Sequence, residues 1–200
     1  MYVIIDYHAN RAEDSQAEAV AFFSEMAAFY GGFNNVIYEV YRAPVDTSWP
    51  DIKAYAAAVI GAIRAVDPDN LVIVGTRSLS REVEEAADDP INDDNVAYSL
   101  QFHAVSDGQE LRDRALRAMD KGAALFVTEW GTSDASRLAP LDAAAVQVWM
   151  DFLRLNNISH TNWAIDDSEH LARGANALGG WDDATLYPSG ELVKSIILGW

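Results

Sequence analysis

The sequence contains no cysteine, few basic residues and no long apolar run, and each deficit excludes a class of protein. Without cysteine there is no disulfide, thiol nucleophile or cysteine-based metal site. The chain has 31 acidic but only 14 basic side chains, and its net charge of −17 argues against nucleic acid or an anionic membrane surface as a partner. No apolar stretch approaches the roughly 18 residues of a transmembrane helix. Such acidity suits a neutral ligand or a protein kept soluble in salt.

What the sequence does contain is enough apolar material for a folded domain. Half of its 200 residues are hydrophobic, and no linker is evident, so we expect one domain over residues 1–200 with a sizeable core. Met1 leads directly into the apolar run Tyr2-Val3-Ile4-Ile5 with no basic segment before it, so we expect no signal peptide in this chain. A chain that begins inside a core strand indicates a fragment.

Apolar runs typical of buried strands recur roughly every 25 to 35 residues, and each is followed by a helical pattern. The strands are expected over residues 2–7, 36–41, 71–76, 96–102, 125–128 and 159–164. Such alternation predicts an α/β fold with a parallel sheet, of the (β/α)₈ or TIM-barrel type. Six units are present where a closed barrel needs eight, which leaves open sheet edges. We therefore expect either a homo-oligomer that completes the missing strands or a smaller closed barrel.

Several helix ends are marked by capping residues. Ser15 and Glu18 have the spacing of a capping box at the start of the first helix, and Gly31-Gly32 predict its end. Pro50 suits the first turn of the second helix. A short acidic helix after the third strand, with carboxylates from Glu82 to Asp89, is expected to present a solvated face.

Polar and aromatic side chains collect where the predicted strands end. Tyr7 and His8 end the first strand, Arg42 the second, Gln101 and His103 the fourth. Because the carboxyl ends of barrel strands face the active site, Glu129, at the end of the run Leu125-Phe126-Val127-Thr128, is a candidate for chemistry. The alternative for such a carboxylate is a simple ion pair with a neighbouring arginine.

Several phrases of the chain resemble glycoside hydrolase family 5, and most closely its bacterial endoglucanases (cellulases). These phrases are Val3 to His8, Asn35 to Val40, Asp67 to Asn70, Ile73 to Thr76, Phe126 to Thr132, Asn162-Trp163 and Gly179 to Trp181. The resemblance implies the last six units of a TIM barrel, starting at the family's third strand. It also implies a secreted enzyme without cofactor that hydrolyses β-1,4-glucans with retention, using two carboxylates about 5 Å apart.

Three residues match family positions in the active site. Glu129 matches the nucleophile, His8 a polar sugar contact and Trp163 a stacking platform. Other positions depart from the family. Its Asn-Glu-Pro, whose Glu is the acid/base, is here Arg42-Ala43-Pro44, so that Ala43 has no proton to give.

Further departures lie at the other strand ends. The family's His-Phe-Tyr is here Gln101-Phe102-His103, and Tyr7 and Leu79 stand where it usually has Trp. The framework phrases survive while the cleft positions change, which indicates either a deliberately reworked site or a relative under different functional demands, rather than random decay.

The altered positions leave several roles open. Arg42 could contact substrate or compensate the charge of Glu129, and His8 and His103 could transfer protons or serve as ordinary hydrogen-bonding residues. Gln101 could donate to a developing negative charge or only fill space. Two His and a Glu could hold a metal, but nothing in their spacing specifies one, so we expect no metal. Candidates to extend a sugar groove are Trp49, Trp130 and Trp181.

These residues predict an endoglucanase-like scaffold with Glu129 retained and native activity weak or lost. One alternative is a repurposed enzyme in which Glu129 is a general base that abstracts a proton from a flat organic substrate stacked on Trp163. A second is a carbohydrate-binding pseudoenzyme. The expected ligand in the first and last cases is an oligosaccharide.

Overall fold

The computed structural model describes residues 1–135, 140–164 and 186–200, and they form an α/β fold with a parallel sheet. The loop from Gly174 to Trp181, including Trp181 as a groove residue, lies outside the described residues. In chain order the elements are β1 (Val3–His8), η1 (Ala12–Ser15), α1 (Gln16–Tyr30), β2 (Val36–Arg42), α2 (Trp49–Arg64), β3 (Val72–Val74), α3 (Arg77–Ser80), α4 (Val83–Asp88), β4 (Val96–His103), α5 (Gln109–Asp120), β5 (Leu125–Gly131), α6 (Ala143–Leu155), β6 (His160–Asn162) and α7 (Pro188–Leu198).

The strands hydrogen-bond in the order in which they occur in the chain, β1 to β6. Residues pair in parallel register, Ile4 with Ile37, Glu39 with Ile73 and Ile73 with Ala97. The predicted α/β fold of TIM-barrel type, represented by six parallel βα units, is therefore confirmed. That the strands complete their sheet through a second copy of the chain stays a prediction.

The described chain groups into two compact units. The first contains Met1–Leu100 and Arg114–Phe126, and the second contains Gln101–Asp113 and Val127–Trp200. The single catalytic domain expected over residues 1–200 stays a prediction.

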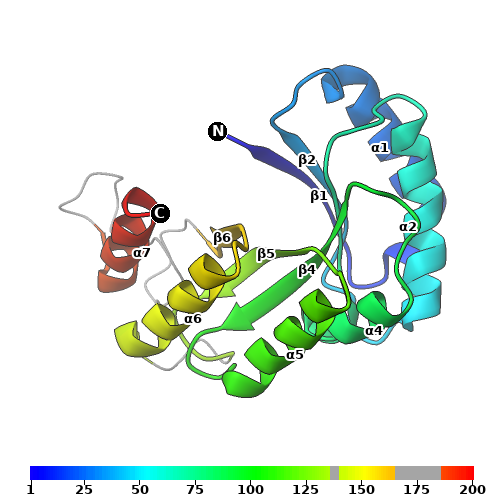
Figure 1. Ribbon diagram of the computed structural model, residues 1–200. Helices are drawn as coiled ribbons and strands as arrows, with labels where there is room; N and C mark the ends of the chain where they lie inside the picture. The colour runs from blue at the N-terminus through cyan, green and yellow to red at the C-terminus, as the bar shows by residue number, and fades with distance from the viewer. Residues whose placement is uncertain (136–139, 165–185) are drawn as a thin grey trace. The chain divides into compact units, whose positions relative to one another are not determined.

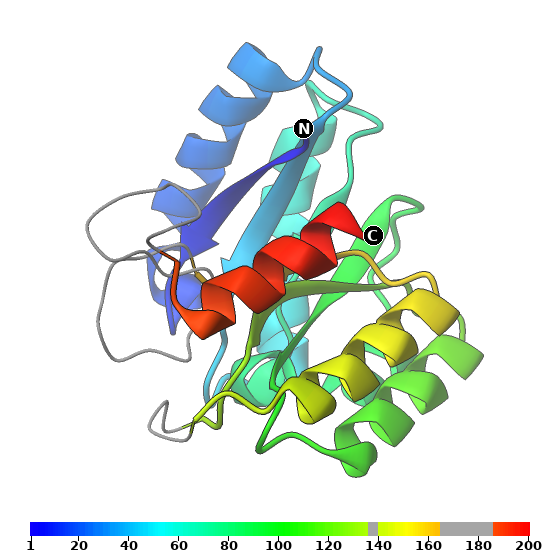
Figure 2. The same ribbon diagram turned by 90° about the vertical axis from the view of Figure 1, so that its left-hand side faces the viewer.

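In the first unit, apolar side chains of the strands form the core of the sheet. Ile37, Ile73 and Ala97 are buried together, with Ile4, Leu71 and Phe126 packed against them. On the other side of β1 and β2 lie α1 and α2, which run side by side (Figures 1 and 2). Phe23 of α1 meets the ring of Tyr38 edge to face, with 6.1 Å between ring centroids. These contacts follow from the alternation of a strand, in which consecutive side chains face opposite sides.

The helix ends agree with most of the predicted caps. Gly31 is the C-cap of α1, and Ser48 caps α2 with Pro50 in its first turn. The prediction of a capping box at Ser15 and Glu18 is wrong, because the Ser15 side chain makes no capping hydrogen bond. Its hydroxyl instead lies 3.0 Å from the Tyr7 hydroxyl, because η1 turns the chain directly before α1.

The carboxylates in and beside helix α4 were expected to face solvent, but several of them form ion pairs with a neighbouring helix. Glu84 accepts two hydrogen bonds from Arg117 of α5, at 2.8 and 3.0 Å, and Asp88 lies 2.5 Å from Lys121. Glu82 pairs with Arg114 at 2.6 Å. The carboxylates therefore pair with basic side chains of the neighbouring helix, a relation that their own stretch of sequence does not show.

The loops after β2 and β3 are joined by backbone hydrogen bonds. The Leu79 amide donates to the Pro44 carbonyl at 2.8 Å, and the Gly75 amide donates to the Tyr41 carbonyl at 2.9 Å. Both loops contain left-handed residues without the freedom of glycine: Ala43 has a φ of 65°, and Ser78, Leu79 and Ser80 lie between 57° and 59°. Such conformations cost on the order of 1–3 kcal/mol each and persist only where surrounding contacts hold them.

Gly75 is the position at which this loop contact is most easily tested. A Cβ at residue 75 would lie 2.2 Å from the Tyr41 carbonyl oxygen and 2.7 Å from Pro44 Cδ, so Gly75→Ala forces the two loops apart. We expect a loss of about 2 to 3 kcal/mol in the free energy of unfolding, measured by urea denaturation. Gly61→Ala is the matched control, because a Cβ there meets nothing within 4 Å and Ala favours the helix by about 1 kcal/mol. Equal stability of the two variants would contradict the close approach.

Candidate active site

In the first unit the carboxyl ends of β1 and β2 bring two predicted site residues together. His8 is paired in register with Arg42, and an Arg42 guanidinium nitrogen lies 3.1 Å from His8 Nδ1 and in contact with Nε2. The guanidinium can only donate, so the ring must offer an unprotonated nitrogen. Burial, and secondly the charge of Arg42, lower the pKa of His8. The pair is therefore a neutral imidazole held by a cation.

Ala43 follows directly in the same loop. Its side chain is 4% exposed, and its backbone is left-handed. A methyl group there neither donates nor accepts a proton. Tyr7, in contrast, faces α1, where its ring lies 5.9 Å from Phe22 and 6.3 Å from Phe23.

In the second unit, β4 and β5 bring Gln101 beside Thr128 and His103 beside Gly131, two residues of the strand that also carries Glu129. Gln101 is 7% exposed, and its amide donates to the Thr128 hydroxyl at 3.5 Å. The His103 amide donates to the Asp107 carboxylate at 2.7 Å. A Cβ on Gly131 would lie only 2.7 Å from His103 Nδ1, so the absence of a side chain at residue 131 gives the His103 ring its room.

Glu129 itself is half-buried near the end of β5. The pairing of β5 with β6 shifts register around it, because Val127 pairs with His160 and Trp130 with Asn162. Such an irregularity re-aims side chains that simple alternation would place on one face, and it is frequent beside active sites. The pairing of β1 with β2 shifts between Asp6 and His8, and that of β2 with β3 between Glu39 and Tyr41. His8 and Arg42 thus follow a local irregularity, and Tyr7 and Glu129 lie within one.

Trp130 lies inside the second unit. It is 1% exposed, and its ring stacks on Phe102, which stacks in turn on Trp149 at 3.8 Å. Its indole N–H donates to His160 Nδ1 at 3.1 Å. No face of this indole is left for a sugar ring, so Trp130 belongs to the core of the second unit.

The other tryptophans differ in exposure. Trp49, in the first unit, is 5% exposed and donates to the Asp89 carbonyl at 2.9 Å, so it too belongs to the core. Trp163 is half-buried after β6, and its amide donates to the Trp130 carbonyl at 3.0 Å. Of the predicted platforms in the described residues, Trp163 retains the exposure that stacking on a sugar needs.

Two groups of functional interest escaped the sequence analysis. One is His160, which contacts the indoles of Trp130 and Trp200. The other is the set of hydrogen bonds between Glu13, Tyr41 and Thr47 in the first unit. No motif marks either group, because their members come from separate segments of the chain.

Two further properties bear on function. Within the described ranges, no three His, Asp or Glu side chains gather in the way that a metal site requires. None of the helices in the described part of the chain is both long and apolar enough to cross a bilayer.

Comparison with known proteins places these residues in context. The family model for cellulases (glycosyl hydrolase family 5) matches residues 1–169. Endoglucanase Z from Dickeya dadantii is 49% identical over 201 residues, which cover 100% of this chain and 46% of that protein. The endoglucanase from Clostridium saccharobutylicum is 47% identical, again with 46% of that protein covered. The chain thus spans about half the length of the curated relatives it matches.

Solved structures agree with the sequence relatives. A protein from Cytophaga hutchinsonii superimposes with a TM-score of 0.95 at 46% identity, over 100% of this chain and 67% of that one. A variant of the catalytic domain of Thermobifida fusca endoglucanase Cel5A, in complex with cellotetraose, gives a TM-score of 0.89 at 30% identity, over 99% of this chain and 70% of that one.

The buried His160 predicts a dependence of stability on pH. Burial, followed by the charge of Arg154, lowers the pKa of His160 to about 4. Between the ordinary value of 6.5 and about 4 the unfolded chain binds a proton that the folded chain does not, so stability falls as pH falls through this window. Discounted for partial exposure of the ring, the loss is on the order of 1–2 kcal/mol.

The measurement compares urea denaturation of the protein and of His160→Gln at several pH values from 7 to 4. Gln accepts the Trp130 hydrogen bond but does not titrate, so the difference between the two proteins isolates residue 160 from the many carboxylates. The difference should grow in favour of the variant as pH falls. Parallel curves would show that His160 does not resist protonation.

Proposed function

We propose, because this chain belongs to glycosyl hydrolase family 5 (the cellulases), that it provides a retaining β-1,4-glucan hydrolase site in which Glu129 is the nucleophile and the general acid is lost at Ala43. The observation that carries the proposal is the half-buried carboxylate of Glu129 near the end of β5, in a chain whose Ala43, buried in the loop after β2 of the other unit, has no proton to give. The activity of the whole protein, its action outside the cell on oligosaccharides and its self-association are parts of the same proposal.

The first chemical step needs the nucleophile. A Glu129 carboxylate oxygen attacks the anomeric carbon, and the electron pair of the breaking glycosidic bond goes to the leaving oxygen. Gln101 and Thr128, joined by their hydrogen bond, and His103 are proposed to orient Glu129 and the sugar hydroxyls near it. Trp163 is proposed as the platform for one sugar face, and His8 with Arg42 as polar contacts.

The missing acid decides which substrates can react. A sugar leaving group departs as an alkoxide unless it is protonated, and the loss of general acid catalysis costs about 10²- to 10⁴-fold in rate. A nitrophenolate leaves readily without a proton. In the second step a family enzyme would use the same carboxylate as base to activate water, and Ala43 cannot do this either. The glycosyl-enzyme should therefore accumulate.

Turnover of an aryl cellobioside with added azide tests this scheme. Azide is a nucleophile that needs no base, so it should displace Glu129 from the anomeric carbon and release a β-cellobiosyl azide, detectable by mass spectrometry. We expect a rate increase with azide for 2,4-dinitrophenyl cellobioside and negligible hydrolysis of cellulose. Glu129→Gln should abolish both the basal and the azide-dependent reaction.

The outcomes separate the candidate functions. A rate that is indifferent to azide and to Glu129→Gln refutes the nucleophile. Calorimetric binding of cello-oligosaccharides without turnover in any arm identifies a carbohydrate-binding protein instead, the class of ligand with which the Thermobifida fusca relative is described.

Restoring the carboxylate is the complementary test. Ala43→Glu places an acid in the loop after β2 and should raise hydrolysis of substrates with poor leaving groups, such as cellotetraose, by about 10²- to 10⁴-fold. It should also remove the response to azide, because the side chain fills the space and supplies the base. Ala43→Gln has the same size but no acid, so it controls for shape. Equal rates of the Glu and Gln variants would locate the acid elsewhere.

A further inference from the structure

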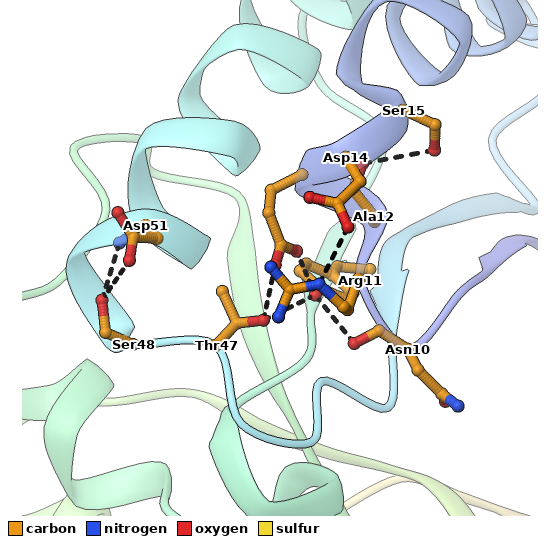
Figure 3. A network of polar contacts seen from close by, with 10 residues as sticks. Asn10, Arg11, Ala12, Asp14, Ser15, Thr47, Ser48 and Asp51 are labelled. Atoms are coloured by element: carbon orange, nitrogen blue, oxygen red, sulfur yellow. Dashed lines mark hydrogen bonds and ion pairs between the residues drawn. The ribbon is translucent and has the colours of Figure 1, made fainter.

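A carboxylate outside the strands joins the two ends of the loop that carries Arg42 and Ala43. Glu13 lies in η1, five residues after His8, and its side chain is 17% exposed. The Tyr41 hydroxyl donates to Glu13 Oε2 at 2.5 Å, and the Thr47 hydroxyl donates to Glu13 Oε1 at 2.8 Å. Figure 3 shows Thr47 and Arg11 in this network of polar contacts. The Arg11 guanidinium lies 3.5 Å from Glu13 Oε1.

We name this contact the Glu13 clasp (Glu13, Tyr41 and Thr47). Its two hydrogen bonds restrict the positions of the three side chains. Each hydroxyl has one hydrogen, and the shortest contact of each is with Glu13. The Tyr41 hydroxyl also lies 3.2 Å from the Asn10 carbonyl oxygen and 3.2 Å from the Thr47 hydroxyl. Tyr41 and Thr47 are 0% and 5% exposed. Hydrogen bonds to a carboxylate in such surroundings are about twice as strong as those between neutral groups.

The clasp fixes residues on both sides of the altered positions. Tyr41 directly precedes Arg42 and Ala43, and Thr47 follows them at the far end of the loop. The same loop is also held by the loop after β3, whose Gly75 and Leu79 amides donate hydrogen bonds to the Tyr41 and Pro44 carbonyls. The left-handed backbone of Ala43 therefore lies between two sets of contacts, and neither its own preference nor a glycine holds it there.

We propose that Glu13 is a positioning residue, which through Tyr41 and Thr47 holds the loop after β2 so that Arg42 stays on His8 and Ala43 keeps its left-handed backbone. The functional meaning of this role rests on the proposed hydrolase site. The placement of Arg42 on His8 does not, and it can be measured without any activity.

His8 reports directly on the position of Arg42. The charged groups that face its ring include Arg42 of β2 and Asp6 of β1, whose carboxylate lies 3.6 Å from His8 Nδ1. Because Arg42 contributes to the lowered pKa of His8, release of Arg42 should raise that pKa. The chain has only four histidines, so their ring protons can be followed individually by NMR titration.

The test uses two variants that change no charge. Tyr41→Phe and Thr47→Val each remove one hydrogen bond to Glu13, and each should raise the pKa of His8 by about half of the rise seen in Arg42→Gln, which sets the full effect. In the azide reaction both should raise KM, because Arg42 and His8 are the proposed polar contacts to the sugar. Thr47→Ser keeps the hydroxyl and should restore both values.

Tyr38→Phe is the matched control. Tyr38 lies on the same strand, is 0% exposed, and donates its hydroxyl to the Asp67 carboxylate at 2.8 Å, but at the opposite end of β2. The variant loses the same kind of bond and should lower the unfolding midpoint similarly, with the pKa of His8 unchanged.

The outcomes are distinct. A His8 pKa that stays constant in Tyr41→Phe and Thr47→Val, while it rises in Arg42→Gln, overturns the positioning role. An equal rise in Tyr38→Phe also overturns it, because general loosening of β2 then explains the effect. A rise confined to the clasp variants supports it even if no glycoside is turned over, and in that case only the proposed hydrolase function fails.

Discussion

Parallel pairing is the constraint on which the candidate site depends. Within each unit it brings the carboxyl ends of neighbouring strands to one edge, so that residues far apart in sequence, such as His8 and Arg42, meet there. The register is regular in the apolar half of the strands, where Ile4, Ile37 and Ile73 pack. It becomes irregular at the ends. The regular half stabilises the sheet through its buried apolar side chains. The irregular half changes the direction in which the polar side chains point.

The loop after β2 shows what this arrangement costs. A left-handed Ala43 and three successive left-handed residues after β3 are unfavourable by themselves. They persist because amide–carbonyl bonds join the two loops and because Gly75 allows the backbones to touch. An alanine in this conformation gains nothing from it, since alanine in an ordinary loop needs no such backbone. The contacts of the loop, and not the preference of the alanine, therefore determine the backbone at this position.

The sequence predicted the sheet better than the surroundings of its ends. Strands and helix stops could be predicted because apolar period, Gly31 and Pro50 act locally. Ser15 could not, since its hydroxyl is used by Tyr7 across the β1–α1 connection. Trp130 and Trp49 looked like candidate groove residues from their place beside loops, yet burial depends on what packs against them. The pairing of Glu13 with Tyr41 and Thr47 joins residues 28 and 34 positions apart, a relation that no single sequence exposes.

In the proposed site, Arg42-Ala43 stands where the family has Asn-Glu, and the two changes alter the charge in the same direction. Deleting a carboxylate leaves the site one negative charge poorer, and adding a guanidinium next to it makes the local change two units of charge in the same direction. In a chain of net charge −17, a cation at this edge is held by neighbours such as His8 rather than left to solvent. In the proposed site, attack by Glu129 needs no second carboxylate, whereas protonation of a poor leaving group and activation of water do, so the substitutions remove those two steps and leave the first nucleophilic attack possible.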